Sequence, residues 1–221
     1  MPAAPDSARR AAEAVAAFAR GELVLVQDDE DREDEGDLVC AAETVTPEQV
    51  AFVVRWTTGI VCVPMTGADL DRLALPQMVE QNAESLRTAF AVSVDAAAGI
   101  TTGVSAAERA LTIRTLADPD TTAADLVRPG HVFPLRYREG GLRVRRGHTE
   151  ATVDLALAAG RRPVGVLAEL VAEDGSMMRG PQLRAFASRH RLPHVTVGEL
   201  AEHLPPLAGA AAGSARGADV R

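Results

Sequence analysis

Lysine is absent from this 221-residue chain, and aromatic residues make up only 3% of it. All 23 basic residues are therefore arginines, and 31 acidic residues outweigh them to give a net charge of −8. General nucleic-acid binders carry a basic face, so this balance argues against nucleic acid as a partner. With so few aromatic rings, the core must be built from Ala, Val and Leu, which suits helices packed closely on a sheet.

Cysteines and long apolar runs are also scarce. The two cysteines, Cys40 and Cys62, lie in short apolar stretches, so we expect buried thiols, and two are too few for a structural zinc site. No apolar run approaches the roughly 20 residues that a membrane-spanning helix needs. The first residues lack a basic segment followed by an apolar one, so no secretory signal is expected. These absences predict a soluble, cytoplasmic protein with no membrane partner.

Short apolar strands alternate with helical patterns along the chain. Thr46-Pro47-Glu48 has the form of a helix start, and Ser105 with Glu108 fits a capping box. Asp174-Gly175 is a strong hairpin signal, which makes the predicted sheet mixed rather than purely parallel. We expect strands near 23–27, 38–42, 60–63, 90–95, 128–135, 164–171 and 194–197, and a loop over 77–88.

These patterns predict an α/β fold with an α+β-type mixed sheet, arranged as a single-domain three-layer α-β-α sandwich. No linker divides the chain, so residues 1–206 are assigned to one domain. The Ala- and Gly-rich residues 207–221 show no periodicity and are predicted to be a disordered tail.

The most unusual stretch is Asp28–Asp37, in which all residues except Arg32 and Gly36 are carboxylates. It connects two predicted core strands, where such a density of negative charge repels itself. Arg32 offsets only part of that charge. A hard divalent cation, Mg²⁺ or Mn²⁺, held by oxygen ligands beside an anionic substrate would offset the rest. A plain solvated loop is the alternative interpretation.

Two familiar metal motifs do not fit. An EF-hand loop beginning at Asp31 has Gly36 at its sixth position, but Ala42 stands where the bidentate glutamate is required. His148-Thr149-Glu150 matches the His-x-Glu of zinc deaminases, but the chain has no Pro-Cys-x-x-Cys. Calcium-hand and zinc-deaminase chemistry are therefore excluded.

A second informative stretch runs from Arg145 to Glu150. Thr149 stands where a helix is expected to begin, with free backbone N–H groups and the positive end of the helix dipole. Arg145 and Arg146 precede it and add cationic donors, so the stretch indicates a phosphate site, although arginines before helices are also common. His148 could ligate the same cation as the acidic stretch, or serve only as a structural hydrogen-bonding group.

Two further titratable groups, His131 and Glu169, lie in apolar surroundings in the sequence. Burial would raise the pKa of the glutamate and allow a role in acid–base catalysis. The alternative is that each is a core residue whose polar atoms bond to a neighbouring backbone group. Thr101-Thr102-Gly103 could bind an anion, or be an ordinary start of a helix.

Four stretches resemble motifs of the 3,4-dihydroxy-2-butanone 4-phosphate synthase family of riboflavin biosynthesis. They are residues 28–37, 99–107, 128–135 and 145–151, and the resemblance runs in order from about residue 7 to 203. Asp34 departs from the Asn that the family often has, and Trp56-Thr57-Thr58-Gly59 departs from a commoner His-Gly-Ser-Gly. Neither departure removes a functional residue.

The resemblance implies a monofunctional enzyme without the fused GTP cyclohydrolase II domain of many relatives. The implied reaction converts D-ribulose 5-phosphate to L-3,4-dihydroxy-2-butanone 4-phosphate plus formate, with Mg²⁺ or Mn²⁺, in a homodimer whose active sites lie near the subunit interface. Implied metal ligands are Glu33 and His148, and His131 and Glu169 are implied to be essential for proton transfer. The residues implied to contact the sugar phosphate are Arg32, Glu33, Asp37, Arg145, Arg146, Gly147, His148, Thr149 and Glu169.

Two other functions remain open from the residues alone. Another Mg²⁺-dependent sugar-phosphate lyase or phosphatase would use the same groups, and a catalytically silent ligand-binding dimer would conserve the architecture without turnover. The residues also leave open how proton transfers divide among Asp37, His131 and Glu169, and how many ions bind.

Overall fold

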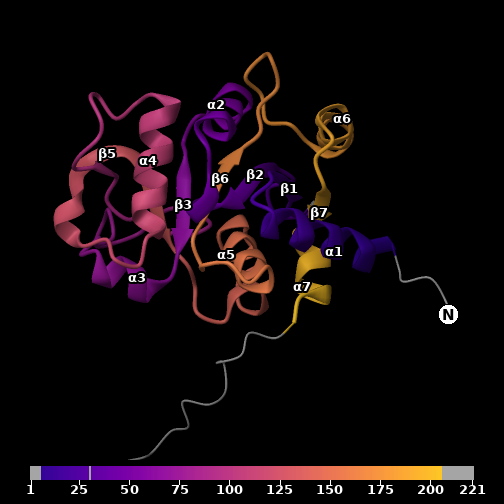
Figure 1. Cartoon of the computed structure of the whole chain (residues 1–221). Helices are drawn as coiled ribbons and strands as arrows, with labels where there is room; N and C mark the ends of the chain where they lie inside the picture. Colours follow the sequence, from indigo (N-terminus) through magenta and orange to yellow (C-terminus); the bar gives the residue numbers. More distant parts are fainter. Residues whose placement is uncertain (1–5, 30, 206–221) are drawn as a thin grey trace, which may run out of the picture.

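The computed structural model describes residues 6–29 and 31–205, and within them seven strands form one sheet (Figure 1). The strands are β1 Val24–Gln27, β2 Gly36–Ala41, β3 Cys62–Met65, β4 Val94–Ala96, β5 Leu126–Arg136, β6 Gly165–Glu169 and β7 His194–Thr196. Their order across the sheet is β4-β5-β3-β6-β2-β1-β7. The pairs β1–β7 and β3–β5 are parallel and the other pairs antiparallel, which confirms the predicted mixed sheet.

Two helices begin at the predicted caps, Thr46 and Ser105, whereas the helix expected to begin at Thr149 has Gly147 as its N-cap. The Thr46 hydroxyl accepts a hydrogen bond from the Gln49 N–H at 3.2 Å, and the Ser105 hydroxyl does so from Glu108 at 3.2 Å. The α-helices are α1 Asp6–Ala19, α2 Pro47–Trp56, α3 Gly67–Arg72, α4 Ala106–Ala117, α5 His148–Ala158, α6 Gly180–His190 and α7 Val197–His203. Short 3₁₀ helices cover Ala42–Thr44, Ala123–Asp125 and Gly141–Arg143.

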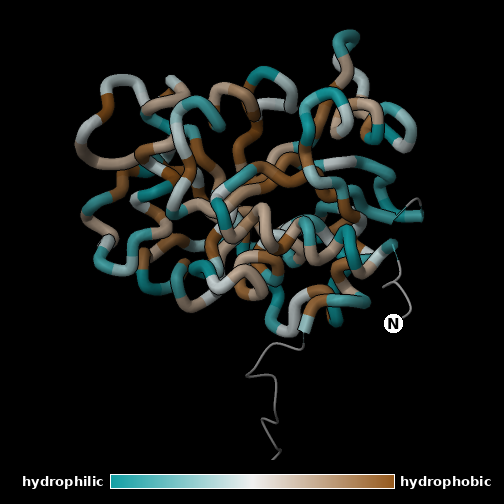
Figure 2. The backbone as a smooth tube through the Cα atoms, turned by 45° about the vertical axis from the view of Figure 1, so that its right-hand side comes forward, coloured by the Kyte–Doolittle hydropathy of each residue, from teal (hydrophilic) through white to brown (hydrophobic). Residues whose placement is uncertain are grey.

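The sheet separates two hydrophobic cores. Successive side chains of a strand point to opposite faces, and in β2 Leu38 and Cys40 join the core beneath α2, α4 and α6. Val39 and Ala41 join the core beneath α1, α5 and α7. Figure 1 shows α2 and α6 above the strands and α5 and α7 below them, and Figure 2 shows the apolar strands at the centre of the molecule. The predicted three-layer α-β-α sandwich is confirmed.

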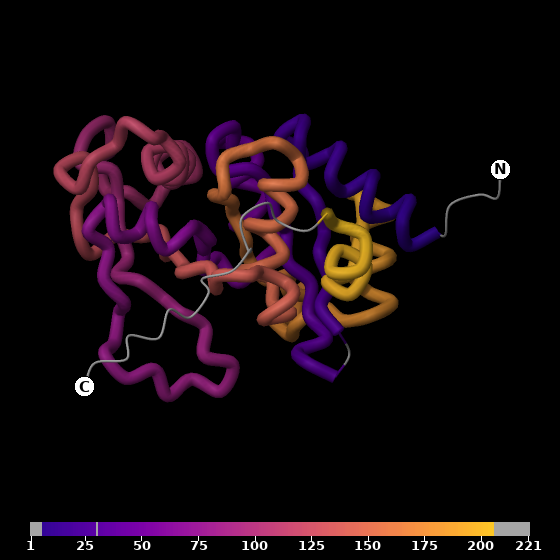
Figure 3. Tube along the Cα trace, turned by 90° about the horizontal axis from the view of Figure 1, so that it is seen from below, coloured from indigo at the N-terminus to yellow at the C-terminus, as the bar shows by residue number. Residues whose placement is uncertain are grey.

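The strand predicted over 90–95 is shorter and lies later, as β4. Phe90 and Ala91 make only isolated bridges, to Leu135 and Gln77. β4 covers only three residues, and its ladder with β5 shifts register between Val94 and Asp95. The predicted loop before it is confirmed, and this segment extends away from the body of the fold (Figure 3).

Other predictions have mixed outcomes. Asp174-Gly175 does form a tight turn, but it closes only an isolated bridge between Val171 and Met177. Cys40 and Cys62 are buried thiols, as expected. Among the described residues, no helix combines the length and apolar character needed to cross a bilayer. The predicted tail, residues 207–221, lies outside the described residues, and the single domain over 1–206 stays a prediction.

Candidate active site

Strand pairing places two carboxyl groups side by side at the end of the sheet. Asp37 at the start of β2 is the cross-strand partner of Glu169 at the end of β6. Directly paired residues point to the same face of a sheet. Two positions along each strand, Val39 and Leu167 lie in the core beneath α1, α5 and α7. The side chains of Asp37 and Glu169 therefore face the layer of helices that contains α5.

The acidic stretch forms the loop of the β1–β2 hairpin. The Asp28 N–H donates to the Glu35 carbonyl at 3.0 Å, and the Glu35 N–H donates to Asp28 Oδ1 at 2.9 Å. Asp34 has a φ of +54°, in the left-handed region where Asn and Asp are enriched. These local bonds close the base of the loop and turn its chain back toward β2.

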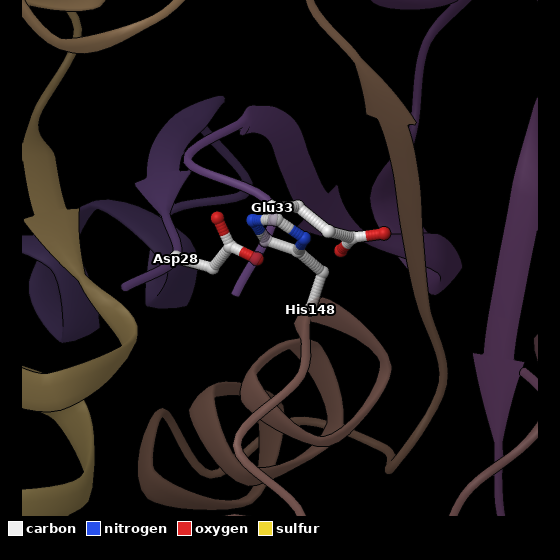
Figure 4. Close-up of side chains that lie close together, drawn as sticks. All are labelled: Asp28, Glu33 and His148. Carbon is white, nitrogen blue, oxygen red and sulfur yellow. The ribbon is translucent and has the colours of Figure 1, made fainter. Parts of the chain in front are cut away.

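Within that loop, two carboxylates converge on the first residue of α5 (Figure 4). One oxygen each of Asp28 and Glu33 and one ring nitrogen of His148 all lie within 4.8 Å of one another. Among the described residues, His148 Nε2 and Asp37 Oδ1 are buried without a hydrogen-bond partner. Two carboxylates and an imidazole suit a divalent cation, and an unpartnered buried nitrogen fits a missing ligand bond. Asp28 is a third candidate ligand that sequence reasoning did not single out.

A positive charge already lies between the two carboxylates. Arg32 Nη1 is 2.6 Å from Asp28 Oδ2 and also contacts the Glu33 carboxylate. The guanidinium thus offsets the repulsion that the sequence indicated. A bound cation would compete with Arg32 for the same carboxylate oxygens.

Burial shifts the pKa values of two groups beneath the loop, His148 and Asp37. It lowers the pKa of His148 to about 4, despite the opposing attraction of Asp28, so the imidazole is neutral near pH 7. Neutral imidazole is the form that binds metals. Burial, followed by the charges of Glu169 and Glu33, raises the pKa of Asp37 well above its ordinary value.

Arg145 is positioned by a buried partner. Its Nη1 is 2.6 Å from Glu150 Oε2, and its Nη2 donates to Thr88 Oγ1 at 3.2 Å and to the Leu86 carbonyl at 3.3 Å. Glu150 is 1% exposed and also accepts from the Arg138 N–H at 3.2 Å. Sequence reasoning missed Glu150 and Thr88. The sequence did carry a signal for Glu150. It is a carboxylate directly after Thr149 and five residues after Arg145.

Most of the predicted site residues surround one cavity. Those brought together are Arg32, Glu33, Asp37, Arg145, His148, Thr149 and Glu169, with Glu35, Cys62, Thr88, Phe90, Leu135 and Leu167 completing the walls. A second cavity shares Arg145 and Thr149 and is lined by three more arginines, Arg87, Arg136 and Arg138. Arg145 and Thr149 therefore border both a carboxylate-rich cavity and an arginine-rich one, which favours a ligand with an anionic end.

Three predicted residues do not line either cavity. Arg146 is 62% exposed and lies 3.9 Å from Asp29. Gly147 is the N-cap of α5, where a Cβ would contact the Arg145 guanidinium, so glycine leaves room for that side chain. His131 is on β5. Its ring Nδ1 is 2.7 Å from Asp95 Oδ2, and its backbone N–H donates a hydrogen bond to Asp95 Oδ1 at 3.0 Å.

The surroundings of the two predicted acid–base groups also differ from the expectation. The apolar environment predicted for His131 is wrong, because its side chain is 45% exposed and bonded to a carboxylate. Glu169 is half-buried, and its Oε2 accepts a hydrogen bond from the Thr58 hydroxyl at 2.6 Å. The Thr58 N–H donates to the Glu169 carbonyl at 2.9 Å, so this threonine fixes both ends of the residue.

Comparison with known proteins agrees with the resemblance. A family model described as 3,4-dihydroxy-2-butanone 4-phosphate synthase matches residues 12–203. The chain belongs to this synthase family. A relative of that name from Aeromonas salmonicida (strain A449) is 53% identical over 198 residues, which are 90% of this chain and 91% of the relative.

Solved structures of the synthase family share the fold. A crystal structure of 3,4-dihydroxy-2-butanone 4-phosphate synthase in complex with two magnesium ions has a TM-score of 0.84 and 47% identity, covering 87% of this chain and 94% of that one. A riboflavin biosynthesis protein RibBA of Nocardia farcinica (strain IFM 10152) is 56% identical over 189 residues. The matches to five curated riboflavin biosynthesis proteins, this one among them, cover 85% of this chain. They cover only 34% to 46% of those relatives' own length.

For this synthase-family chain, we expect metal-free stability to depend on pH through His148. The folded imidazole stays neutral down to about pH 4, whereas the ordinary pKa is 6.5. The unfolded chain therefore binds more protons in that window, so the free energy of unfolding falls as pH is lowered from 6.5 towards 4. A His148→Gln variant lacks this contribution. Its stability relative to wild type should rise as pH is lowered.

Urea denaturation at successive pH values in EDTA measures this difference. His203→Gln is the matched control, since His203 lies on α7 and bonds to Ser7. Parallel pH profiles for wild type and His148→Gln would contradict the expectation.

Proposed function

We propose that this chain converts D-ribulose 5-phosphate to L-3,4-dihydroxy-2-butanone 4-phosphate plus formate, as a Mg²⁺- or Mn²⁺-dependent enzyme of riboflavin biosynthesis. The observation that carries the proposal is the convergence of Asp28, Glu33 and His148. Glu33 and His148 line the cavity that Arg145 and Thr149 also line. The 53% identity to a relative named for this activity, over 91% of that relative's length, supports it. Substrate and products balance without an added oxidant or reductant, so no redox cofactor is required.

Binding of the sugar phosphate divides between two parts of the cavity. Arg145 and Thr149 stand at the beginning of α5, where backbone N–H groups and the helix dipole favour a phosphate. Glu33 and His148, with Asp28, would hold the divalent cation. When bound, that cation supplies Lewis-acid polarisation of ketone and hydroxyl oxygens. The two parts together determine where the carbon chain lies.

Proton transfer is assigned to groups on the same side of the sheet. Asp37 is buried, and burial raises its pKa well above the ordinary value, which suits a carboxyl with a role in acid–base catalysis. Glu169 is its cross-strand neighbour and has one oxygen fixed by Thr58. The pair can therefore deliver a proton to an oxygen and remove one from a carbon of a substrate lying between α5 and the sheet.

His131 requires a different explanation, because it does not line the cavity of its own chain. We propose a homodimer in which His131 reaches the cavity of the partner subunit, consistent with the interface location that the resemblance implies. Its bond to the buried Asp95 would orient the ring. Arg146, on the exposed side of the α5 start, stays a predicted substrate contact. The cytoplasmic location and the absence of nucleic-acid partners also stay predictions.

A ¹³C NMR time course with uniformly labelled ribulose 5-phosphate tests the function. Formate and a four-carbon phosphate should appear with Mg²⁺ and disappear with EDTA. Release of inorganic phosphate without formate would point instead to another sugar-phosphate lyase or phosphatase. Bound but unchanged substrate would point to a silent binding protein.

A further inference from the structure

Arg179 reaches from the far end of the chain to the acidic loop. It immediately precedes α6, after the turn that follows β6. Its Nη1 donates to the backbone carbonyl of Glu33, and its Nη2 lies 3.4 Å from Glu35 Oε1. Arg179 therefore bonds to the main chain of a residue whose side chain is a candidate ligand.

The helix that carries Arg179 is firmly packed. Leu183 and Phe186 of α6 are buried, and a Cβ at Gly36 would lie only 2.6 Å from Leu183 Cδ2. The rings of Phe186 and Trp56 of α2 are 5.6 Å apart between centroids, in an edge-on arrangement. Because α6 contacts both α2 and the first residue of β2, its start is a fixed point against which the loop can be held.

Arg179 and Arg32 contact Glu33 in different ways. Arg32 bonds to the carboxylates of Asp28 and Glu33, whose oxygens a cation would need. Arg179 bonds to the carbonyl and leaves the Glu33 carboxylate available. Among the described residues, the other bonds at the base of the loop join Asp28 to Glu35 and Gln27 to Asp34, and none of these involves Glu33.

We propose that Arg179 is a positioning residue that holds Glu33 in place for the divalent cation, so that α6 contributes to cation affinity without contacting the ion. This inference rests on the proposed metal role of Glu33. Partners that orient a ligand from outside the coordination sphere typically change metal affinity by about 10- to 100-fold when mutated.

A titration of the full chain with Mn²⁺ tests the inference, with the free ion measured by electron paramagnetic resonance. Arg179→Met should weaken Mn²⁺ binding about 10-fold, whereas Arg179→Lys, which keeps a cationic donor, should recover most of the affinity. Arg189→Met is the matched control, because Arg189 is exposed on α6 and has no ion pair among the described residues. At saturating Mn²⁺, kcat of Arg179→Met should stay within about two-fold of wild type, since positioning is then restored by the bound ion.

Wild-type Mn²⁺ affinity in Arg179→Met would overturn the inference. So would weaker binding that is matched by a lowered thermal midpoint, because the loss would then belong to folding. The proposed function can fail separately: wild-type protein that binds Mn²⁺ but makes no formate would refute the reaction, while the affinity ratio still tests Arg179. Absence of Mn²⁺ binding by wild type would overturn both.

Discussion

His148→Gln should abolish measurable Mn²⁺ binding and lower kcat for formate production by about 10³-fold, because a site-bound Lewis acid stabilises the charge that develops on substrate oxygens. His148 is the nitrogen member of the three-residue cluster, and its Nε2 has no hydrogen-bond partner within the described part of the chain. Glutamine fills a similar volume, so the buried start of α5 should remain folded. Isothermal calorimetry with Mn²⁺ and a formate assay measure the two effects.

His203→Gln provides the control for a histidine substitution away from the cavity and should match wild type in both assays. The interpretation of His148 as a ligand would be wrong if His148→Gln bound Mn²⁺ with wild-type affinity. A folded variant with normal affinity but no turnover would move His148 from cation binding to substrate binding.

Mixing two inactive variants should restore activity if His131 acts in the partner's cavity. His131→Ala and Glu169→Gln should each lower kcat by about 10²- to 10⁴-fold, the range for loss of a general acid or base. In a mixed dimer, one cavity then lacks both groups and the other lacks neither. Random exchange of subunits in a two-fold symmetric dimer makes about half the dimers mixed, so activity should reach about a quarter of wild type.

Co-expression with two different affinity tags isolates the mixed dimer for the formate assay. Glu173→Gln, an exposed carboxylate soon after β6, is the control for Glu169→Gln and should keep full activity. If His131 and Glu169 act in the same chain, every cavity of the mixed dimer carries one defect and no activity returns. That result would refute the exchange of His131 between subunits.

Much of the candidate site could be predicted because charge and local pattern mark it. The acidic run between two strands indicated a cation site, and the arginines before α5 indicated an anion site. Both interpretations depend on short-range features of the chain. The caps at Thr46 and Ser105 were visible for the same reason, since a cap and its partner lie three residues apart.

The parts that sequence reasoning missed depend on long-range geometry. Eight carboxylates occur in the acidic stretch, and nothing in their spacing indicates that Asp28 joins Glu33 and His148. Thr58 meets Glu169 only because the chain after α2 passes the end of β6. The register shift that shortens β4 and the bond from His131 to Asp95 likewise arise between segments far apart in the chain.

The strand order also bears on how the protein is made. β1 is synthesised early, but one of the two strands that pair with it, β7, begins only at His194. The other, β2, has one edge that stays unpaired until β6 has been synthesised. During translation, therefore, apolar strand edges near the start of the chain remain open until most of the protein has left the ribosome. Such late closure of non-local pairs slows folding and exposes a nascent chain to aggregation, which makes protection by chaperones most useful for the first 160 or so residues.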